Sequence, residues 1–231
     1  MPNTLITGAN KGLGKEAARR LLAAGHDVWV GARDPERGRA AADELGARFV
    51  QLDVTDDASV AAAVATIEAD GGLDVLVNNA GVATTFGVPV GDVTAEAVEA
   101  VHATNVIGVV RVTQAFMPLL ERSAAPVVVN VSSGLGSFAS VLDESRIESK
   151  VIDLAYLSSK AAVNMLTVQY AKAYPGVRIN CVDPGYTATD LNHNQGHQTV
   201  EEGTDAMVRM AQIGPDGPTG TTSDREGPAR W

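Results

Sequence analysis

The chain has 231 residues, of which 45% are hydrophobic and 20% charged, a composition typical of one folded globular domain. Its formal net charge of −10 opposes binding to nucleic acid and to anionic membrane surfaces. The single cysteine, Cys181, cannot form an internal disulfide. The N-terminus does not resemble a secretory signal, and we expect no apolar run long enough to cross a membrane. We therefore predict a cytoplasmic protein without a membrane partner.

Short apolar runs alternate along the chain with longer, alanine-rich segments of helical period. The predicted strands are Thr4–Thr7, Asp27–Ala32, Arg48–Leu52, Asp74–Val77, Pro126–Val131 and Val177–Val182. The predicted helices are Gly12–Gly25, Pro35–Leu45, Asp56–Ala69, Ala95–Leu120 and Leu154–Ala173. This alternation predicts a single α/β domain over residues 1–231: a doubly wound, Rossmann-type parallel sheet with helices on both faces. Residues 214–231 are expected to form a turn-rich C-terminal tail of that domain.

The first predicted strand runs directly into a glycine-rich loop that opens the first predicted helix. Its three glycines are spaced Gly-x3-Gly-x-Gly. Glycines here let the backbone approach a pyrophosphate, and the helix N-terminus offers free N–H groups and the positive end of its dipole. A glycine triplet can also serve a plain turn, but its place between a strand and a helix favours dinucleotide binding. The predicted contacts are Gly8, Asn10, Lys11, Gly12, Leu13 and Gly14.

Further motifs follow the third, fourth and sixth predicted strands: Asp53-Val54, Asn78-Asn79-Ala80-Gly81 and Pro184-Gly185-x-Thr187-x-Thr189. Together with the glycine loop, and in this order, they resemble the motifs of the short-chain dehydrogenase/reductase family over most of the chain. In motif detail the chain is most similar to the carbonyl-reductase branch. The resemblance implies an oxidoreductase whose further cofactor contacts are Asp53, Val54, Asn79, Ala80, Gly81, Pro184, Gly185, Thr187 and Thr189.

The end of the second predicted strand bears on the choice of cofactor. An acidic residue there would bind the ribose 2′-hydroxyl of NAD, whereas an arginine can bind the 2′-phosphate of NADP. By the resemblance, Ala32 stands at the usual acidic position and Arg33 follows it. Arg33 and Lys11 favour NADPH over NADH. Two alternatives stay open: Asp34 could bind the ribose of NADH, and Arg33 could simply pair with Asp34 or Glu36 on the surface.

A tyrosine and a lysine four residues apart lie on the last predicted helix, so their side chains share one face. Alone, such a pair is usually a surface feature. The family resemblance adds a serine and an asparagine, and so implies a catalytic tetrad of Asn105, Ser133, Tyr156 and Lys160. Adjacent strand residues point to opposite faces, and the family pattern places the catalytic serine second, which favours Ser133 over Ser132.

Carbonyl reduction needs a hydride at carbon and a proton at oxygen, and Tyr156 is the expected proton donor. A free phenol has a pKa of about 10. A cationic Lys160 about 5 Å away is expected to lower the pKa of Tyr156 by about two units. The Ser133 hydroxyl can hold the substrate oxygen. The resemblance also counts Tyr156 and Lys160 among the cofactor contacts, with Lys160 at the nicotinamide ribose. It assigns Asn105 to a water that links Lys160 to solvent. We expect hydride transfer between NADPH and a small ketone or aldehyde.

Two segments depart from the commonest family pattern. Ser133 and Tyr156 are 23 positions apart, which exceeds the usual spacing, so Val141–Ile152 is expected to be an insertion beside the pocket that shapes substrate choice. The tail lacks the Gly-rich end through which many relatives form tetramers, which leaves the oligomeric state open.

Two other functions fit the sequence less well. A nucleotide-sugar epimerase or dehydratase would need a larger C-terminal substrate domain than the stretch after Gly185 provides. A non-catalytic dinucleotide-binding redox sensor would not need the four tetrad residues together. His193 and His197 lie in a polar, loop-like stretch without a neighbouring carboxylate motif, so no metal site is expected.

Overall fold

The computed structural model describes all 231 residues. Seven parallel strands form one sheet in the order β3-β2-β1-β4-β5-β6-β7. They are β1 Asn3–Thr7, β2 Asp27–Ala32, β3 Arg48–Gln51, β4 Val75–Asn78, β5 Val127–Val131, β6 Arg178–Val182 and β7 Thr222–Ser223. The strand order reverses between β1 and β4, and at such a switch point a crevice opens at the carboxyl ends of the strands.

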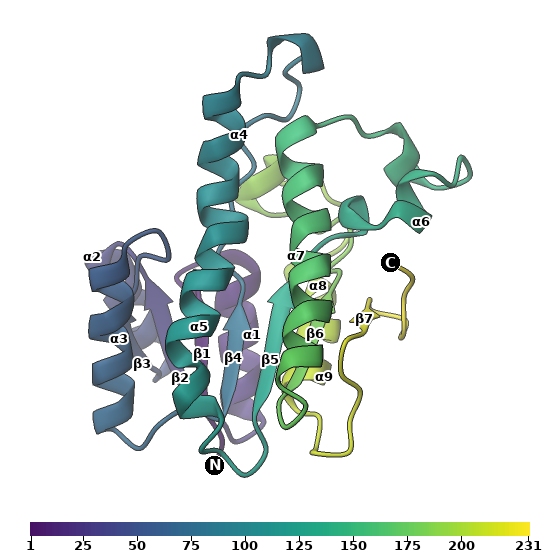
Figure 1. Cartoon of the computed structure of the whole chain (residues 1–231). Helices are drawn as coiled ribbons and strands as arrows, with labels where there is room; N and C mark the ends of the chain where they lie inside the picture. The colour runs from purple at the N-terminus through teal and green to yellow at the C-terminus, as the bar shows by residue number, and fades with distance from the viewer.

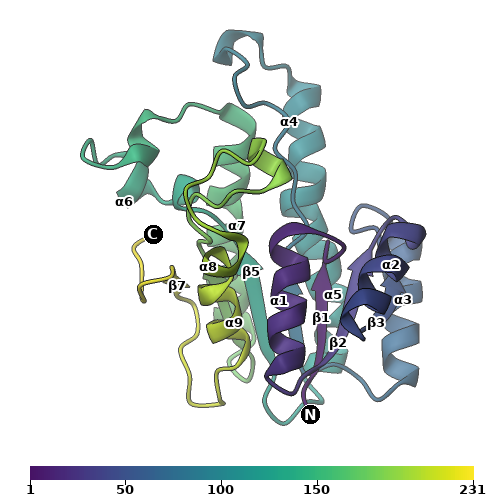
Figure 2. The same cartoon turned by 180° about the vertical axis from the view of Figure 1, so that it is seen from behind.

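Helices cover both faces of the sheet, which confirms the predicted doubly wound fold. One face carries α3 (Asp57–Ala69), α5 (Gly108–Leu120) and α7 (Leu154–Ala173), as Figure 1 shows. The other carries α1 (Gly12–Ala23), α2 (Pro35–Leu45) and α9 (Asp205–Ala211), which come forward in Figure 2.

The core consists of two apolar layers, one on each face of the sheet. The neighbouring residues Leu5 and Ile6 of β1 are fully buried in opposite layers. This is the pattern of a strand covered on both sides, and it explains why the predicted strands are apolar throughout. The sheet therefore presents its polar strand ends, rather than its faces, to a ligand.

The predicted helix Ala95–Leu120 is a helical run with a π-helical turn, Ala103–Ile107, between α4 (Ala95–His102) and α5. Such turns are frequent at functional sites, and Asn105 lies in this one. By length and hydropathy alone the run could cross a membrane, so the expectation that no segment reaches that length is wrong. Its most apolar window is 56% buried inside the protein, as in a core helix.

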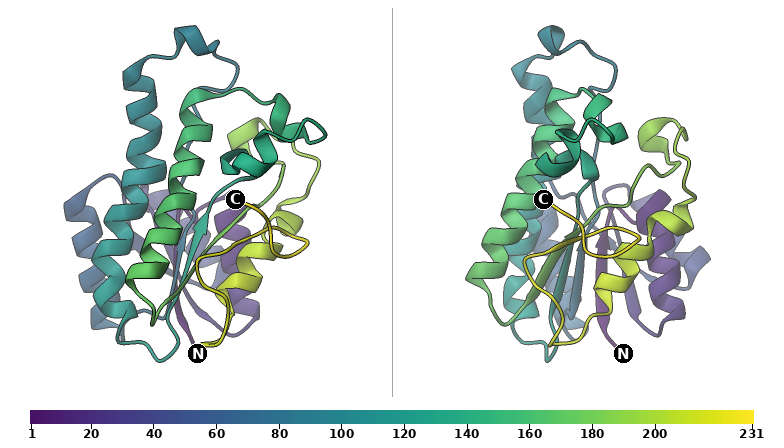
Figure 3. Two further views of the ribbon diagram at one scale, coloured as in Figure 1. Left: turned by 45° about the vertical axis from the view of Figure 1, so that its right-hand side comes forward. Right: turned by 90° about the vertical axis from the view of Figure 1, so that its right-hand side faces the viewer.

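The C-terminal tail holds an element that the sequence did not reveal. Thr222 and Ser223 form β7, which pairs parallel with β6 at the edge of the sheet. The chain end then lies beside the short helix α6 (Phe138–Val141), as Figure 3 shows. The hydroxyl of Ser137, the residue before this helix, donates to the Arg230 carbonyl at 3.0 Å. A two-residue strand has too little periodicity to be recognised from sequence, because its neighbours in the sheet decide its conformation.

Candidate active site

The glycine loop lies between β1 and α1 and has the geometry of an anion-binding site. Gly8 and Gly12 have φ angles of +65° and +54°, which favour glycine. Gly14 has no room for a side chain, because a Cβ there would lie 2.5 Å from Asn79 Nδ2 and 2.8 Å from the Gly8 carbonyl oxygen. Helix α1 has no side-chain N-cap and no acidic residue in its first turn. Its first N–H groups are therefore available to a pyrophosphate, and this loop fits a dinucleotide.

Two residues after β4 hold the glycine loop in place. The Thr7 hydroxyl accepts from the backbone N–H groups of Asn79 and Ala80, at 3.0 and 2.9 Å. The side-chain amide of Asn79 donates to the carbonyl oxygens of Thr7 and Gly8. These bonds join the two strands on either side of the switch point. Thr7 was missed as a site residue, although its place before the first glycine was the available signal.

Three charged residues after β2 have different roles in the structure. The Asp34 carboxylate accepts from the backbone N–H groups of Glu36 and Arg37 at 3.0 and 3.1 Å, and so caps α2. Its ion pair, at 3.6 Å, is with Arg37. Arg33 is exposed and makes no ion pair. The structure thus disfavours both alternatives, Asp34 as the ribose ligand and Arg33 as a surface partner of Asp34 or Glu36.

Lys11 differs from Arg33 because it already has a partner. Its ammonium pairs with the Asp190 carboxylate at 2.7 Å, with both side chains more than half exposed. An exposed pair of this kind contributes little stability, so an anionic ligand can compete for Lys11. Asn10 and Leu13 flank the same loop, half-buried.

The two residues after β3 lie at the expected edge but have local roles. The Asp53 carboxylate accepts from the backbone N–H and the hydroxyl of Thr55, and these bonds hold the pKa of Asp53 below its usual value. Val54 is buried and packs closely against Gly108 at the start of α5, where a Cβ would lie only 2.9 Å from the Val54 side chain. Neither contact tests the predicted role of Asp53 and Val54 in binding the cofactor.

Tyr156 and Lys160 lie in the first turns of α7 and are buried, with 7% and 5% of their surface exposed. Asp153 caps this helix, because its carboxylate accepts from the Tyr156 N–H at 2.7 Å and from the Thr85 hydroxyl at 2.8 Å. The Lys160 ammonium lies 5.5 Å from the centre of the Tyr156 ring and donates to the Val131 carbonyl at 2.9 Å. Two donors of Lys160 stay free for a ligand.

The two adjacent serines after β5 point to different sides, as expected. The Ser132 hydroxyl is buried and donates to the Asn164 side chain. Ser133 is only partly buried. Burial raises the pKa of the Tyr156 phenol, and the Ser133 side chain lies close enough to that phenol to oppose part of this rise. The structure therefore brings Ser133, not Ser132, to Tyr156.

Asn105 projects from the π-helical turn toward the loop after β4. Its side-chain oxygen accepts from the Val82 N–H at 2.8 Å, and its amide nitrogen donates to the Val82 carbonyl and to the Ser159 hydroxyl. A Cβ on Gly81 would lie 3.5 Å from Asn105 Oδ1 and 3.8 Å from Lys160 Nζ. Asn105 thus fixes the loop beside Lys160, while its predicted role in holding a water stays a prediction.

Burial dominates the electrostatics of the tyrosine and the lysine. Desolvation, followed by the nearby Asp183 carboxylate, raises the pKa of Tyr156 above its usual value. Desolvation lowers the pKa of Lys160 to about 8. The expectation that Lys160 lowers the Tyr156 pKa is therefore wrong for the protein alone, because the loss of water around the phenol outweighs the nearby cation. A phenol that keeps its proton is the form that a proton donor needs.

Segments after Gly81 and Gly134 border the tyrosine and the serine. The Phe86 ring lies 5.2 Å from that of Tyr156. A polar cavity of about 330 Å³ adjoins Ser133 and reaches Asp143 and Arg146 of the segment 141–152. The insertion therefore contacts the cavity beside the predicted serine.

Pro184, Gly185, Thr187 and Thr189 follow β6, and the Thr187 hydroxyl donates to the Pro184 carbonyl at 2.8 Å. Thr189 begins a short 3-10 turn, in which its N–H donates to the Asn192 side chain. Both threonines therefore shape this segment locally, and its place at the carboxyl edge agrees with the predicted cofactor contacts without testing them.

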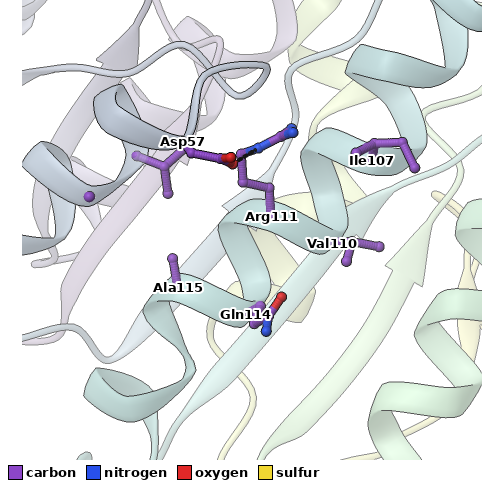
Figure 4. Close-up of a pocket in the computed structure, with 8 residues that line it drawn as sticks. Asp57, Ile107, Val110, Arg111, Gln114 and Ala115 are labelled. Carbon is purple, nitrogen blue, oxygen red and sulfur yellow. Dashed lines mark hydrogen bonds and ion pairs between the residues drawn. The ribbon is translucent and has the colours of Figure 1, made fainter.

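A separate groove of about 480 Å³ lies between α3 and α5 and contains none of the predicted catalytic residues (Figure 4). It is lined mostly by aliphatic side chains such as Val60 and Val110, and the ion pair between Asp57 and Arg111 borders it. This groove is therefore not the candidate active site, which lies at the carboxyl ends of the strands, where the predicted catalytic residues are.

The fold and the site define a dinucleotide-dependent oxidoreductase. The chain belongs to the short-chain dehydrogenase family, because the family model described as short chain dehydrogenase matches residues 2–200. It is 35% identical to short-chain dehydrogenase/reductase 1 of Saponaria officinalis, over 94% of this chain and 91% of the relative.

Solved structures agree with this assignment. The NADPH-bound carbonyl reductase from chicken fatty liver superimposes with a TM-score of 0.86 at 29% identity, covering 100% of this chain and 99% of the other. Salutaridine reductase from Papaver somniferum gives a TM-score of 0.85 at 30% identity, with 96% and 99% covered.

Proposed function

We propose that the chain is an NADPH-dependent carbonyl reductase in which Tyr156 donates the proton to a ketone or aldehyde oxygen. The observation that carries the proposal is the convergence of Ser133, Tyr156 and Lys160 at the strand ends, beside a glycine loop suited to a pyrophosphate. The similarity to a carbonyl reductase and to salutaridine reductase supports the reductive direction.

The residues have distinct tasks in this reaction. The Ser133 hydroxyl holds the carbonyl oxygen and stabilises charge that develops there. A bound nicotinamide in its reduced form supplies a hydride to the carbonyl carbon. The O–H bond of Tyr156 breaks as its proton passes to the oxygen, which leaves an alcohol and a phenolate. When protonated, Lys160 stabilises that phenolate, and its free donors suit the ribose hydroxyls.

Arg33 and Lys11 support NADPH as the cofactor. Arg33 is exposed and unpaired at the end of β2, where a 2′-phosphate is recognised, and Asp34 is engaged as a helix cap. The similar chicken reductase was solved with NADPH. An arginine fork suits a phosphate better than a hydroxyl, so we propose that Arg33 selects NADPH over NADH.

The proposal is tested by measuring NADPH and NADH consumption with a panel of aldehydes, ketones and quinones. We expect turnover with NADPH for at least one carbonyl class, and weaker turnover with NADH. Cofactor binding without turnover of any carbonyl would instead support the redox-sensor alternative.

Shortening the insertion is expected to change substrate preference. Replacing residues 143–150 with a short turn removes Arg146 and Glu148, which lie next to Gly134 and the cavity beside Ser133. Loss of a few pocket contacts changes relative kcat/KM between carbonyls by roughly ten- to a hundredfold. The NADPH Kd should stay within about twofold, because the glycine loop and Arg33 lie elsewhere. An unaltered order of substrates would count against a role in specificity.

A further inference from the structure

The loop after β4 has an inverted pattern of burial. Among residues 84–92, Thr85 is the only buried residue, with 3% of its surface exposed. The apolar residues that follow it, Phe86, Val88 and Val90, are exposed instead. A hydroxyl gains nothing from burial unless it is hydrogen-bonded, whereas large apolar side chains gain most from it. A loop that buries its threonine and exposes its phenylalanine therefore offers an apolar surface to a ligand rather than to its own core.

The residues before and at the start of α7 show the same inversion. Asp153 is buried, with 4% of its surface exposed, while its neighbours Ile152 and Leu154 are exposed. The Thr85 hydroxyl donates to the Asp153 carboxylate, whose two oxygens lie 2.8 and 2.9 Å away. The two segments, 68 positions apart in the chain, thus bury their polar residues against each other. A buried carboxylate needs hydrogen-bond donors, so this contact fixes the loop on the helix.

A tight turn leads from this anchor to the candidate proton donor. The Thr85 carbonyl accepts from the Val88 N–H at 3.0 Å, and Gly87, the third residue of the turn, has a φ of +82°. Phe86 is the second residue of the turn, so the anchored Thr85 sets its position. The Phe86 ring lies 5.2 Å from the Tyr156 ring and is tilted by 48° to it, yet 40% of the residue stays exposed. An accessible aromatic surface is therefore held next to the phenol.

One carboxylate holds both sides of this aromatic contact. Asp153 Oδ1 accepts from the Tyr156 N–H at 2.7 Å as well as from the Thr85 hydroxyl. The first bond fixes the turn of α7 that carries the phenol, and the second fixes the loop that carries Phe86. Asp153 therefore sets the position of Phe86 relative to Tyr156. A carbonyl oxygen that accepts the Tyr156 proton brings its substituents within reach of the Phe86 ring.

We propose that Thr85 and Asp153 are positioning residues that hold Phe86 as an apolar wall for the substrate, so that carbonyl compounds with an apolar ring on the carbonyl carbon are preferred. This inference rests on the proposed function and names its substrate class. A ring packs on an aromatic side chain, whereas a short-chain ketone leaves most of that surface in contact with water. The wall contributes to substrate binding and so to KM, while the Tyr156 hydroxyl contributes to kcat.

The test measures kcat and KM with acetophenone, which has a phenyl ring on the carbonyl carbon, and with butanone, which has none. We expect the parent to reduce acetophenone with the higher kcat/KM. Thr85→Val keeps the shape of the side chain but removes its hydroxyl, and should raise KM for acetophenone about three- to tenfold. KM for butanone, both kcat values and the NADPH Kd should stay within about twofold. Thr85→Ser keeps the hydroxyl and should keep the parent KM.

Two further variants separate positioning from a purely structural role. Phe86→Ala removes an exposed side chain, so the protein should fold, and KM for acetophenone should rise as in Thr85→Val. Thr4→Val is the matched control, because the hydroxyl of this buried threonine is hydrogen-bonded to His26 Nδ1 at 2.8 Å near the amino end of β1. Thr4→Val should lower the melting temperature and leave both KM values unchanged.

Three results would overturn the inference while the proposed function stands. The first is an acetophenone KM at the parent value in Thr85→Val or in Phe86→Ala. The second is an equal rise in KM for butanone, and the third is a parent that reduces butanone or other short-chain carbonyls in preference to acetophenone. A parent that reduces no carbonyl of any class would overturn both the inference and the proposed function.

Discussion

Replacing Tyr156 with phenylalanine is expected to lower kcat by roughly 10²- to 10⁴-fold, the contribution of a positioned proton donor. The ring stays in contact with Phe86, and only the hydroxyl near Ser133 is lost. Burial raises the pKa of this phenol, so the parent holds the proton that the reaction consumes. NADPH should therefore bind to Tyr156→Phe about as tightly as to the parent.

A matched control is available on the same helix. Tyr170 lies farther along α7, half-buried, and its ring stacks on that of Tyr174 with 6.2 Å between the ring centres. Tyr170→Phe should keep the parent kcat. The measurement is steady-state turnover of the best carbonyl of the panel, with the NADPH Kd by fluorescence. Activity of Tyr156→Phe within tenfold of the parent would refute the assignment of Tyr156 as proton donor.

The second large effect is expected at the 2′-phosphate. Arg33→Ala should weaken NADPH roughly ten- to a hundredfold, because a charge-assisted hydrogen bond contributes about 1.5–3 kcal/mol. NADH lacks the phosphate and should bind almost unchanged. The protein's net charge of −10 repels anions, which makes a local cation more important. Lys11 must give up Asp190 to help, so Lys11→Ala should have the smaller effect.

Arg37→Ala is the control for Arg33→Ala. Arg37 lies four residues along on the same exposed stretch but is paired with the cap residue Asp34. Its removal should leave both NADPH and NADH affinity within about twofold of the parent, as expected for a surface charge. The dissociation constants of NADPH and NADH are compared for the parent, Arg33→Ala and Arg37→Ala at one salt concentration. Equal weakening of NADPH and NADH by Arg33→Ala would show that Arg33 does not bind the 2′-phosphate.

Much of the fold followed from local sequence patterns. Strands buried on both faces are apolar throughout, so β1, β2 and β5 were recognisable from sequence, with ends placed to within a residue or so. The range of α7 was predicted as Leu154–Ala173 because caps and helical period act over a few residues. The tetrad depended on the family resemblance, and the structure places Ser133, Tyr156 and Lys160 together at the strand ends with Asn105 nearby.

What the sequence determined by itself is what local spacing and hydrophobic period encode: the strands from β1 to β6, the long helices and the glycine loop. Tertiary structure alone decided the rest. Lys11 became an ion-pair partner of Asp190, and Gln198 a buried acceptor without a partner. The direction of the Tyr156 pKa also depends on burial by distant segments, which sequence spacing does not report. Desolvation and long-range contacts arise only when the chain is packed, so these properties had to come from the structure.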